Sequence, residues 1–383
     1  MRAESLSWDE TTGWRPTAAN LSKSELIIYF SSRQALADGA RFEELRARFP
    51  GATLMGCSTG GQIDSERITD DTVNAVALAF DDTRIKTINE EIRHVADSRR
   101  SGESIGQALF AGDLVGIFVL SDGLHVNGSD LVAGIRSQVG NLPITGGLAG
   151  DGSAFSETLV GVNERPSSRT IAAVGFYGSA VKIGHGSAGG WDVFGPQRRI
   201  TRSRGNVLLD LDGRPALELY ARYLGEEDFK ALPGSALLFP LRIHDSKQPE
   251  HNIVRTVLAV DRELKSMTFA GDMPEGWVAQ LMRGNFQRLA AGAAEAARQA
   301  VDSLADDHTN DGVAILISCI GRRLLMGQRT TEEVEAVRDV LGPRMQQLGF
   351  YSYGEISPHA VSGVCELHNQ TMTVTTITER PPA

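Results

Sequence analysis

One pattern of strand, helix and strand occurs three times along this chain, and it constrains the fold more than any other feature. Each copy opens with a short apolar run, over residues 25–30, 114–120 and 312–318. A helical stretch, a second strand, a loop and a third strand then follow in the same order. A helix that connects two strands of one sheet predicts a right-handed βαβ unit with parallel strands. Three copies in this order exceed what an ordinary α/β chain would show.

The other elements of each copy can be placed from local signals. The second strands are predicted over residues 52–56, 143–147 and 348–353, and the third strands over 74–80, 170–177 and 371–377. Loops are predicted between them at residues 57–62, 148–152 and 354–358. Two helix starts carry the pattern of a capping box, Ser31 with Gln34 and Thr330 with Glu333.

Between the second and third copies the sequence changes character. Antiparallel strands are predicted over residues 236–243, 252–260 and 265–271, and a long amphipathic helix over 277–304. The predicted fold class is α/β, with repeated βαβ units and glycine-rich loops at the carboxyl ends of the strands, plus an antiparallel β-rich, α+β C-terminal part. The predicted domains are an N-terminal extension (1–24), an α/β ligand-binding domain (25–225), a second α/β domain (226–378) and a tail (379–383).

Ligands of parallel sheets sit outside the carboxyl ends of the strands, so the residues there are the candidate site. They offer hydroxyls and charges of both signs, which suit a zwitterionic or carboxylate-bearing small molecule. A solvated rim explains each charged residue by itself. The predicted ligand-binding residues are Cys57, Ser58, Gly60, Asp122, Gly147, Asp151, Ser318, Cys319, Arg322, Tyr351, Tyr353 and Glu355.

Glycine is over-represented, with 41 of 383 residues against a usual share of about 7%. Many of these glycines fall in the segments GCSTGG, GGLAGDG and GHGSAGG, on or near the predicted strand ends. Glycine lets backbone approach a ligand closely and permits positive φ in tight turns. The glycine count therefore favours a pocket among these loops.

Several other functions find little support in the motifs. The segment 56–60 matches G-x-S-x-G, the nucleophile elbow of serine hydrolases, but no helix-forming sequence follows Ser58. A serine hydrolase that uses Ser58 stays open as a minor alternative. No catalytic residues are predicted. Gln62 and Ile63 stand where a phosphate-binding P-loop needs lysine and serine or threonine, so nucleotide binding is disfavoured.

Charge and composition limit the partners. The formal net charge of −10 opposes binding to nucleic acid. No secretory signal and no apolar run of about 18 residues is present, so we expect a soluble cytoplasmic protein without membrane insertion. The three cysteines are too widely spaced to indicate a zinc site or a disulfide framework, and small buried hydrophobes are their default role.

The histidines lack the spacing of a multi-histidine metal site, but a single axial haem ligand needs no such spacing. His185 lies in the segment GHGSAGGW, and His359 follows the third glycine-bearing loop. For each of them a hydrogen-bonded structural histidine is the more ordinary role. His185 or His359 is the predicted haem ligand if haem is bound.

The segments GCSTGGQI, ITGGLAGDG, SCIGRR, LGPRMQQLGFYSYGEISP and LHNQTMTVT resemble the FIST sensory domains, in the same order and over nearly the whole chain. The resemblance implies a cytoplasmic ligand-sensing module of bacterial signal transduction, which binds small molecules such as amino acids and is not an enzyme. It also implies a partner, a separate protein such as a histidine kinase or a diguanylate cyclase.

One branch of that family, the NosP-type nitric-oxide sensors, binds haem and acts on a separate histidine kinase. This sequence is similar to that branch because only a few residues follow position 378. The resemblance therefore implies a stand-alone sensor, with haem and nitric oxide as an alternative to an amino-acid-like ligand.

Overall fold

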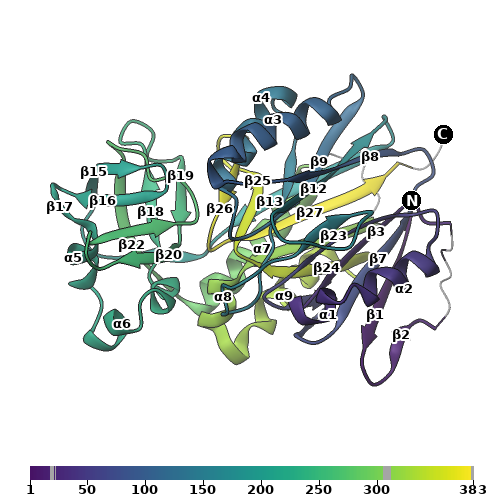
Figure 1. Ribbon diagram of the computed structural model, residues 1–383, viewed down its shortest axis with the longest axis horizontal. Helices are drawn as coiled ribbons and strands as arrows, with labels where there is room; N and C mark the ends of the chain where they lie inside the picture. Colours follow the sequence, from purple (N-terminus) through teal and green to yellow (C-terminus); the bar gives the residue numbers. More distant parts are fainter. Residues whose placement is uncertain (18–20, 22, 305–311, 381–383) are drawn as a thin grey trace.

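The first strand of each predicted copy lies inside a six-stranded sheet of the computed structural model, which describes residues 1–17, 21, 23–304 and 312–380 (Figure 1). These strands are β3 (Leu26–Ser31), β9 (Leu114–Ser121) and β23 (Gly312–Cys319). Each runs parallel to the second strand of its copy and antiparallel to the third. The predicted βαβ units, and with them the α/β fold class, are confirmed.

The sheets take their remaining strands from the same copy and from more distant parts of the sequence. The first sheet adds β1 (Arg2–Asp9), β2 (Gly13–Arg15), β4 (Thr53–Ser58), β7 (Val73–Ala79) and β11 (Val160–Val162). The second adds β8 (Arg84–Glu91), β10 (Ile144–Leu148), β12 (Thr170–Tyr177), β25 (Gly354–Pro358) and β26 (Cys365–His368). The third adds β5 (Gln62–Asp64), β6 (Arg67–Thr69), β13 (Val181–Ala188), β24 (Met345–Ser352) and β27 (Met372–Glu379).

Each copy lends one short strand to a neighbouring sheet. The strand that follows each second strand leaves its own sheet, so β5 pairs with β24, β11 with β4 and β25 with β10. The three copies are thereby joined in a closed ring. Residues 354–358, predicted as a loop, form β25 because their backbone groups pair with β10 and β26.

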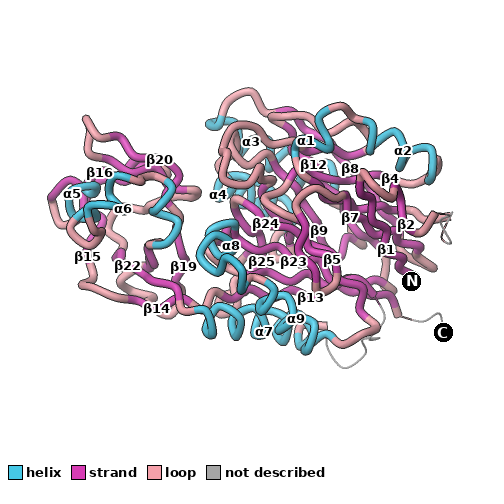
Figure 2. The backbone as a smooth tube through the Cα atoms, turned by 90° about the horizontal axis from the view of Figure 1, so that it is seen from below, coloured by secondary structure: helices cyan, strands magenta, loops and turns pink. Residues whose placement is uncertain are grey.

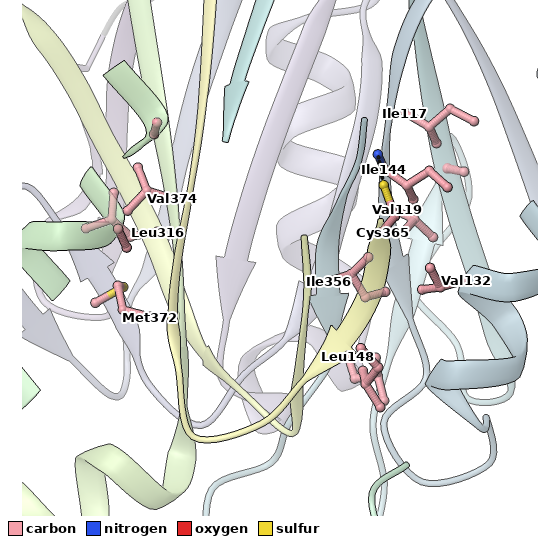
Figure 3. Packing of buried hydrophobic residues seen from close by; sticks show 14 of the residues in the cluster. Ile117, Val119, Val132, Ile144, Leu148, Leu316, Ile356, Cys365, Met372 and Val374 are labelled. Carbon is pink, nitrogen blue, oxygen red and sulfur yellow. Dashed lines mark hydrogen bonds between the residues drawn. The ribbon is translucent and has the colours of Figure 1, made fainter. Parts of the chain in front are cut away.

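Apolar side chains cover both faces of the inner strands, which explains why these strands read as continuous apolar runs. On one face of β3, Leu26, Ile28 and Phe30 meet Phe118 and Phe350 from the other two sheets in a shared central core. The opposite faces of the sheets pack against helices. Figure 3 shows Ile117, Val119 and Ile144 of the second sheet beside Val132 of a covering helix.

The helices lie on the outer faces of the sheets. They are α1 (Arg33–Ala37), α2 (Ala40–Arg48), α3 (Ser98–Leu109), α4 (Gly128–Val139), α7 (Phe286–Asp302), α8 (Ile320–Met326) and α9 (Thr331–Leu341). Short 3₁₀ turns occur at Val95–Asp97 and Gly327–Arg329. Figure 2 shows α7 and α9 side by side below the third sheet.

The predicted caps differ in detail from those observed. Ser32, and not Ser31, caps α1 by accepting a hydrogen bond from the backbone N–H of Ala35. Thr330 stands at the start of α9, but its hydroxyl bonds to the carbonyl of Gly327 and caps no N–H. Glu333 turns inward and is fully buried instead of closing a capping box. Tertiary contacts thus override the local capping pattern at α9.

A β-rich unit is inserted between β13 and α7, and Figure 1 shows it beside the three sheets, to their left. We call residues 191–284 the inserted β unit and the described remainder the three-sheet body. The inserted β unit contains the strands β14 (Trp191–Val193), β15 (Arg198–Arg204), β16 (Val207–Leu211), β17 (Arg214–Pro215), β18 (Leu241–His244), β19 (Asn252–Arg255), β20 (Val257–Asp261), β21 (Ser266–Phe269) and β22 (Val278–Gly284). Two short helices, α5 (Ala216–Ala221) and α6 (Glu226–Lys230), and a 3₁₀ turn at Gly234–Leu238 complete it.

The structure divides the chain differently from the predicted boundary at residue 225, which falls between α5 and α6. Residues on both sides of it share one apolar core, which includes Leu217, Leu241 and Phe269. The helix predicted over 277–304 is also only partly right. Residues 278–284 form β22, because their backbone pairs with β14, β15 and β18.

Two further features concern the ends of the chain and its surroundings. Residues 1–24, predicted as an extension, contribute β1, which pairs with β7 over most of its length. Within the predicted tail, residues 381–383 lie outside the described part of the chain. Among the helices that the structure describes, none combines the length and apolar character needed to cross a bilayer.

Candidate functional site

A polar cavity of about 490 Å³ opens where β3, β4 and β10 end, beside α8. We call it the carboxyl-edge cavity. Its walls come from all three copies, which agrees with the expected position of a site outside the carboxyl ends of strands. The lining residues are Ser32, Arg33, Gln34, Thr59, Gly60, Gly61, Asp70, Asp71, Asp151, Gly152, Ser153, Ile320, Arg323, Leu324 and Gly327.

Beside the cavity, three equivalent hydrogen bonds link the loops that follow the second strands. The N–H of Gly60 donates to Tyr351 O (2.8 Å), that of Gly150 to Ser58 O (3.0 Å), and that of Tyr353 to Leu148 O (3.2 Å). A Cβ at Gly60 would lie 2.7 Å from Ile320 Cδ1 and 3.2 Å from Tyr351 O. Glycine at this position therefore allows the loops to pack closely, in addition to lining the cavity.

Arg323 carries positive charge into the cavity from α8. Its guanidinium makes a two-point contact with Asp70, at 2.6 and 2.8 Å, and also donates to the carbonyl of Gly60. Burial alone would lower the pKa of Arg323, but the hydrogen bond and the charge of Asp70 raise it. The Asp70 side chain is 63% exposed. Arg323 is thus held in place by a partner that solvent or a ligand can reach.

Arg33 supplies the second cation, from the first turn of α1. Its Nη1 lies 3.1 Å from Glu157 Oε2, and its Nε is buried without a hydrogen-bond partner among the described residues. A buried N–H donor without an acceptor is costly, since an unmade hydrogen bond forfeits the desolvation free energy of the group. An acceptor from a bound molecule would satisfy it.

Asp151 is the carboxylate that the structure fixes most firmly in this cavity. It accepts hydrogen bonds from the backbone N–H groups of Ser156 (2.9 Å) and Glu157 (3.0 Å), and from the hydroxyl of Tyr353. Burial would raise the pKa of Asp151, but these hydrogen bonds outweigh it and lower the pKa. Asp151 therefore stays ionised and holds the loop after β10 in position.

Of the predicted ligand-binding residues, the structure brings Gly60 and Asp151 to the cavity. The other ten are buried and do not line it: Cys57, Ser58, Asp122, Gly147, Ser318, Cys319, Arg322, Tyr351, Tyr353 and Glu355. Apart from Gly147, which has no side chain, their side chains lie in the interior. Cys57 and Ser58 belong to β4 and Glu355 to β25, where loops were predicted. The direction of each side chain depends on the sheets that cover it.

Arg322 is the clearest case, because its side chain is fully buried. Its Nε and Nη2 contact Glu333 Oε2, at 2.9 and 2.7 Å. Its Nη1 and Nη2 also donate to carbonyl oxygens, those of Gly189, Gln370 and Leu289. The hydroxyls of Ser318 and Tyr351 complete the network by donating to the other oxygen of Glu333, both at 2.9 Å. The network joins α7, α8, α9 and β23, and its role is structural.

The buried carboxylates of Glu355 and Asp122 likewise accept hydrogen bonds from other groups of the protein. Glu355 accepts hydrogen bonds from Ser352 (2.7 Å) and from the hydroxyl of Thr371 (2.9 Å). Burial raises the pKa of Glu355 to about 8, although these hydrogen bonds act in the opposite direction. Asp122 accepts from the backbone N–H groups of Leu124 and His125 and so closes the turn after β9.

The geometry around Ser58 contradicts a nucleophile elbow. β4 continues through Ser58, and the chain then enters β5, where an elbow requires a helix. The hydroxyl of Ser58 accepts a hydrogen bond from the backbone N–H of Leu159 at 2.9 Å and is completely buried. Burial raises the pKa of the Cys57 thiol well above its ordinary value, so this neighbour is an inert, buried cysteine.

Neither histidine proposed for haem faces the carboxyl-edge cavity. His359 donates from Nε2 to Asn252 O (3.0 Å) and accepts at Nδ1 from the N–H of Val361 (3.2 Å), so both ring nitrogens are engaged. His185 lies on β13, and burial lowers its pKa. A haem needs an apolar slot and a free ligand. The charged lining of this cavity, which includes no histidine, does not fit one.

Sequence reasoning missed Arg33, Asp70, Asp71 and Arg323. Arg33 follows directly on the first strand of the first copy, which is a signal that could have found it. Arg323 stands next to Arg322, and only the packing of α8 decides which of the two is buried. Asp70 and Asp71 lie between β6 and β7, where no motif marks them.

Most of this chain matches a known protein family. A FIST N domain model matches residues 25–214, and a FIST C domain model matches residues 216–358. The chain is 22% identical over 378 residues to the uncharacterised protein MJ1623 of Methanocaldococcus jannaschii. The aligned region covers 88% of this chain and 70% of that protein.

Among solved structures, the chain is similar to a cyanuric acid hydrolase from A. caulinodans, with a TM-score of 0.41, 8% identity and 99% of both chains covered. It is also similar to a chorismatase, with a TM-score of 0.34, 8% identity and 98% of both chains covered. These two likenesses are too distant to bear on function. FIST domains are sensory domains that bind small ligands, and the two domain matches show that this protein belongs to the FIST family.

Proposed function

We propose that this protein senses a small zwitterion, such as an amino acid, which binds in the carboxyl-edge cavity. The observation that carries the proposal is the meeting of two arginines and three aspartates around one cavity of about 490 Å³. A carboxylate suits the guanidinium groups, which recognise it through paired hydrogen bonds. An ammonium group suits the aspartates. A cavity of this volume accommodates a small molecule of that size.

The two arginines are available to different degrees. Arg33 has one buried donor, Nε, without a partner, so a ligand carboxylate would add a contact there without breaking one. Arg323 is already paired with Asp70, and a ligand carboxylate would compete with that exposed aspartate. On the anionic side, Asp71 is exposed beside the cavity, whereas Asp151 is saturated by its own loop. Arg33 and Asp71 are the expected primary contacts.

The signal would leave through α8, which lines the cavity with Arg323 and Leu324. Leu324 is 45% exposed, so a shift of α8 on ligand binding would alter the surface that a partner contacts. The partner is a separate signalling protein such as a histidine kinase or a diguanylate cyclase. The site holds no activated nucleophile, and the ligand is expected to leave unchanged.

Calorimetric titration of the whole protein with a panel of amino acids tests the proposal. At least one amino acid should bind and raise the melting temperature, since a ligand at 100 times its Kd adds about 2.7 kcal/mol. Arg33→Gln and Asp71→Asn should each weaken this binding at least tenfold. The control Arg204→Gln, at an exposed arginine of β15, should not. Binding that neither cavity variant weakens would refute the proposed site.

Two further measurements separate this proposal from its alternatives. Cleavage of activated esters that Ser58→Ala abolishes would establish a hydrolase and overturn the sensor. An intense Soret absorption band after haem loading, lost in His185→Ala or His359→Ala, would establish the haem sensor instead. A wild-type protein that remains without that band after saturation with haem would leave the zwitterion sensor standing.

A further inference from the structure

A second cavity, of about 150 Å³, lies between the three-sheet body and the inserted β unit. The body contributes α4 and β26, and the inserted unit contributes β19 and the segment before β22. Figure 1 shows β19 on the side of the inserted unit that faces β26. We call this space the junction cavity, and it shares no lining residue with the carboxyl-edge cavity. Its lining residues are Ser129, Ala133, Arg136, Ile253, Arg255, Asp272, Pro274, Cys365, Glu366 and Leu367.

Arg255 is buried in the wall of this cavity, with 3% of its surface exposed. Its guanidinium donates to the carbonyl oxygens of Asp272 (3.1 Å) and Leu367 (2.9 Å), and lies 3.5 Å from the hydroxyl of Ser129. Among the described residues it forms no direct ion pair. Burial lowers the pKa of Arg255 to about 10, although the negative charges of Glu366 and Asp272 act in the opposite direction. The group is still charged at neutral pH.

A buried charge without a countercharge is unfavourable, and proteins nearly always pair one. Arg322 illustrates the rule, because it is equally buried and contacts Glu333 directly. Arg255 has no such direct contact, and the carboxylates of Glu366 and Asp272 act on it only from farther away. An anion bound in the junction cavity would supply the direct contact.

Arg136 provides a second guanidinium, from the body side of the cavity. It stands in the last turn of α4, half-buried, and makes no ion pair with another residue that the structure describes. The hydroxyl of Ser129, about two turns away on the same face of α4, adds a neutral donor. Two guanidinium groups and a hydroxyl form a donor set that matches a carboxylate, because guanidinium recognises its two oxygens with paired hydrogen bonds.

The strand β26 offers an acceptor to the same cavity. Glu366 Oε1 lies 2.8 Å from His251 Nε2, but its Oε2 is buried and has no hydrogen-bond partner within the described ranges. Asp272, the other carboxylate, already accepts from the amide of Asn127 at 2.9 Å. A buried carboxylate oxygen without a donor is unfavourable, because its lost hydration is not replaced by a hydrogen bond. A bound molecule with a donor group would correct it.

We propose that the junction cavity binds a small carboxylate that also carries a hydrogen-bond donor, such as a short 2-hydroxy or 2-amino acid. The carboxylate lies between Arg136 and Arg255, and the donor meets Glu366. The volume of about 150 Å³ equals that of roughly five water molecules, which limits the ligand to a few heavy atoms. This site is independent of the function proposed for the carboxyl-edge cavity.

The position of the site gives binding a structural consequence. Arg136 and Glu366 belong to the body, and Arg255 belongs to the inserted β unit. A ligand that contacts all three would hold the two units together, in addition to the direct bond from Arg255 to Leu367. The attachment of the inserted β unit to the three-sheet body would thereby depend on whether the junction cavity holds its ligand.

Titration calorimetry of the full protein, in a buffer free of carboxylate and phosphate, tests the site with glycolate, glycine, acetate and inorganic phosphate. Glycolate or glycine should bind at least tenfold more tightly than acetate, which lacks the donor, and than phosphate. Arg136→Gln should weaken that binding at least tenfold. The surface control Arg204→Gln should leave it unchanged. For glycolate, which is not a zwitterion, Arg33→Gln in the carboxyl-edge cavity should leave binding unchanged as well.

Glu366→Gln supplies a second variant, which keeps the shape of the side chain and should weaken binding of the donor-bearing ligands but not of acetate. Circular dichroism establishes that each variant is folded before titration. The proposal is overturned if no probe binds wild type, if Arg136→Gln binds as tightly as wild type, or if Arg33→Gln abolishes the signal, which would assign it to the other cavity. Slower amide exchange in β19 and β26 with glycolate, absent in Arg136→Gln, would support the link between the units.

Discussion

Two neighbouring arginines at the start of α8 lie in opposite environments. The Arg322 side chain is completely buried and paired with an equally buried Glu333, whereas the Arg323 side chain is 23% exposed and paired with Asp70, which is 63% exposed. Both pairs join distant segments by short contacts. They differ in what surrounds them, because core atoms enclose the first pair and the second opens into the carboxyl-edge cavity.

The exposure of each ion pair decides which of these charges can take part in ligand binding. A buried pair is insulated from solvent, so removal of one partner leaves an uncompensated charge in the core. An exposed pair contributes little to stability, because water replaces the lost partner. A ligand can therefore compete for Arg323 but not for Arg322. Charge at a strand end is not by itself evidence for a binding site.

The largest expected effect is on the buried pair. Glu333→Ala should lower the free energy of unfolding by about 3–5 kcal/mol, since it leaves the buried guanidinium of Arg322 without its carboxylate partner. Urea denaturation followed by circular dichroism measures the change. The matched variant Asp70→Ala should cost less than about 1 kcal/mol. Equal losses in the two variants would show that the environments do not differ as described.

A second test concerns Glu355, whose folded pKa of about 8 lies above the ordinary value of 4.5. Between these pH values the folded state keeps a proton that the unfolded state releases, so stability should fall as pH rises through this window. The slope should be at most about 1.4 kcal/mol per pH unit. Glu355→Gln should reduce the dependence of the melting temperature on pH between pH 5 and 8. An unchanged slope in the variant would assign the dependence to another group.

The smallest expected effect on stability is that of Arg323→Gln, at less than about 1 kcal/mol. The same variant should weaken binding of the zwitterion in the carboxyl-edge cavity, because it removes a cation from the wall. Thermal unfolding and calorimetric titration measure the two quantities on one sample. A large loss of stability, or unchanged ligand affinity, would place Arg323 with Arg322 as a structural residue.

The sequence predicted the strands of the three copies well, because each is a short apolar run bounded by turn residues, and β3, β9 and β23 are confirmed in place. It predicted secondary structure less well where the local hydrophobic pattern conflicts with strand pairing. Residues 278–284 carry apolar residues at helical spacing, yet they form β22, since three neighbouring strands satisfy their backbone. Of the predicted site, Gly60 and Asp151 lie at the cavity, while Arg33 and Arg323 were missed.

The sequence by itself determined the class of fold, the order of the repeated units and the edge of the sheets where a site would form. These depend on hydrophobic periodicity and turn residues, which are local properties. Only the tertiary structure decided that short strands are exchanged among the three copies, and that Arg322 is buried while Arg323 is not. It also decided that Arg136, Arg255 and Glu366 meet at one cavity. Such outcomes depend on contacts between residues far apart in sequence, which no local pattern records.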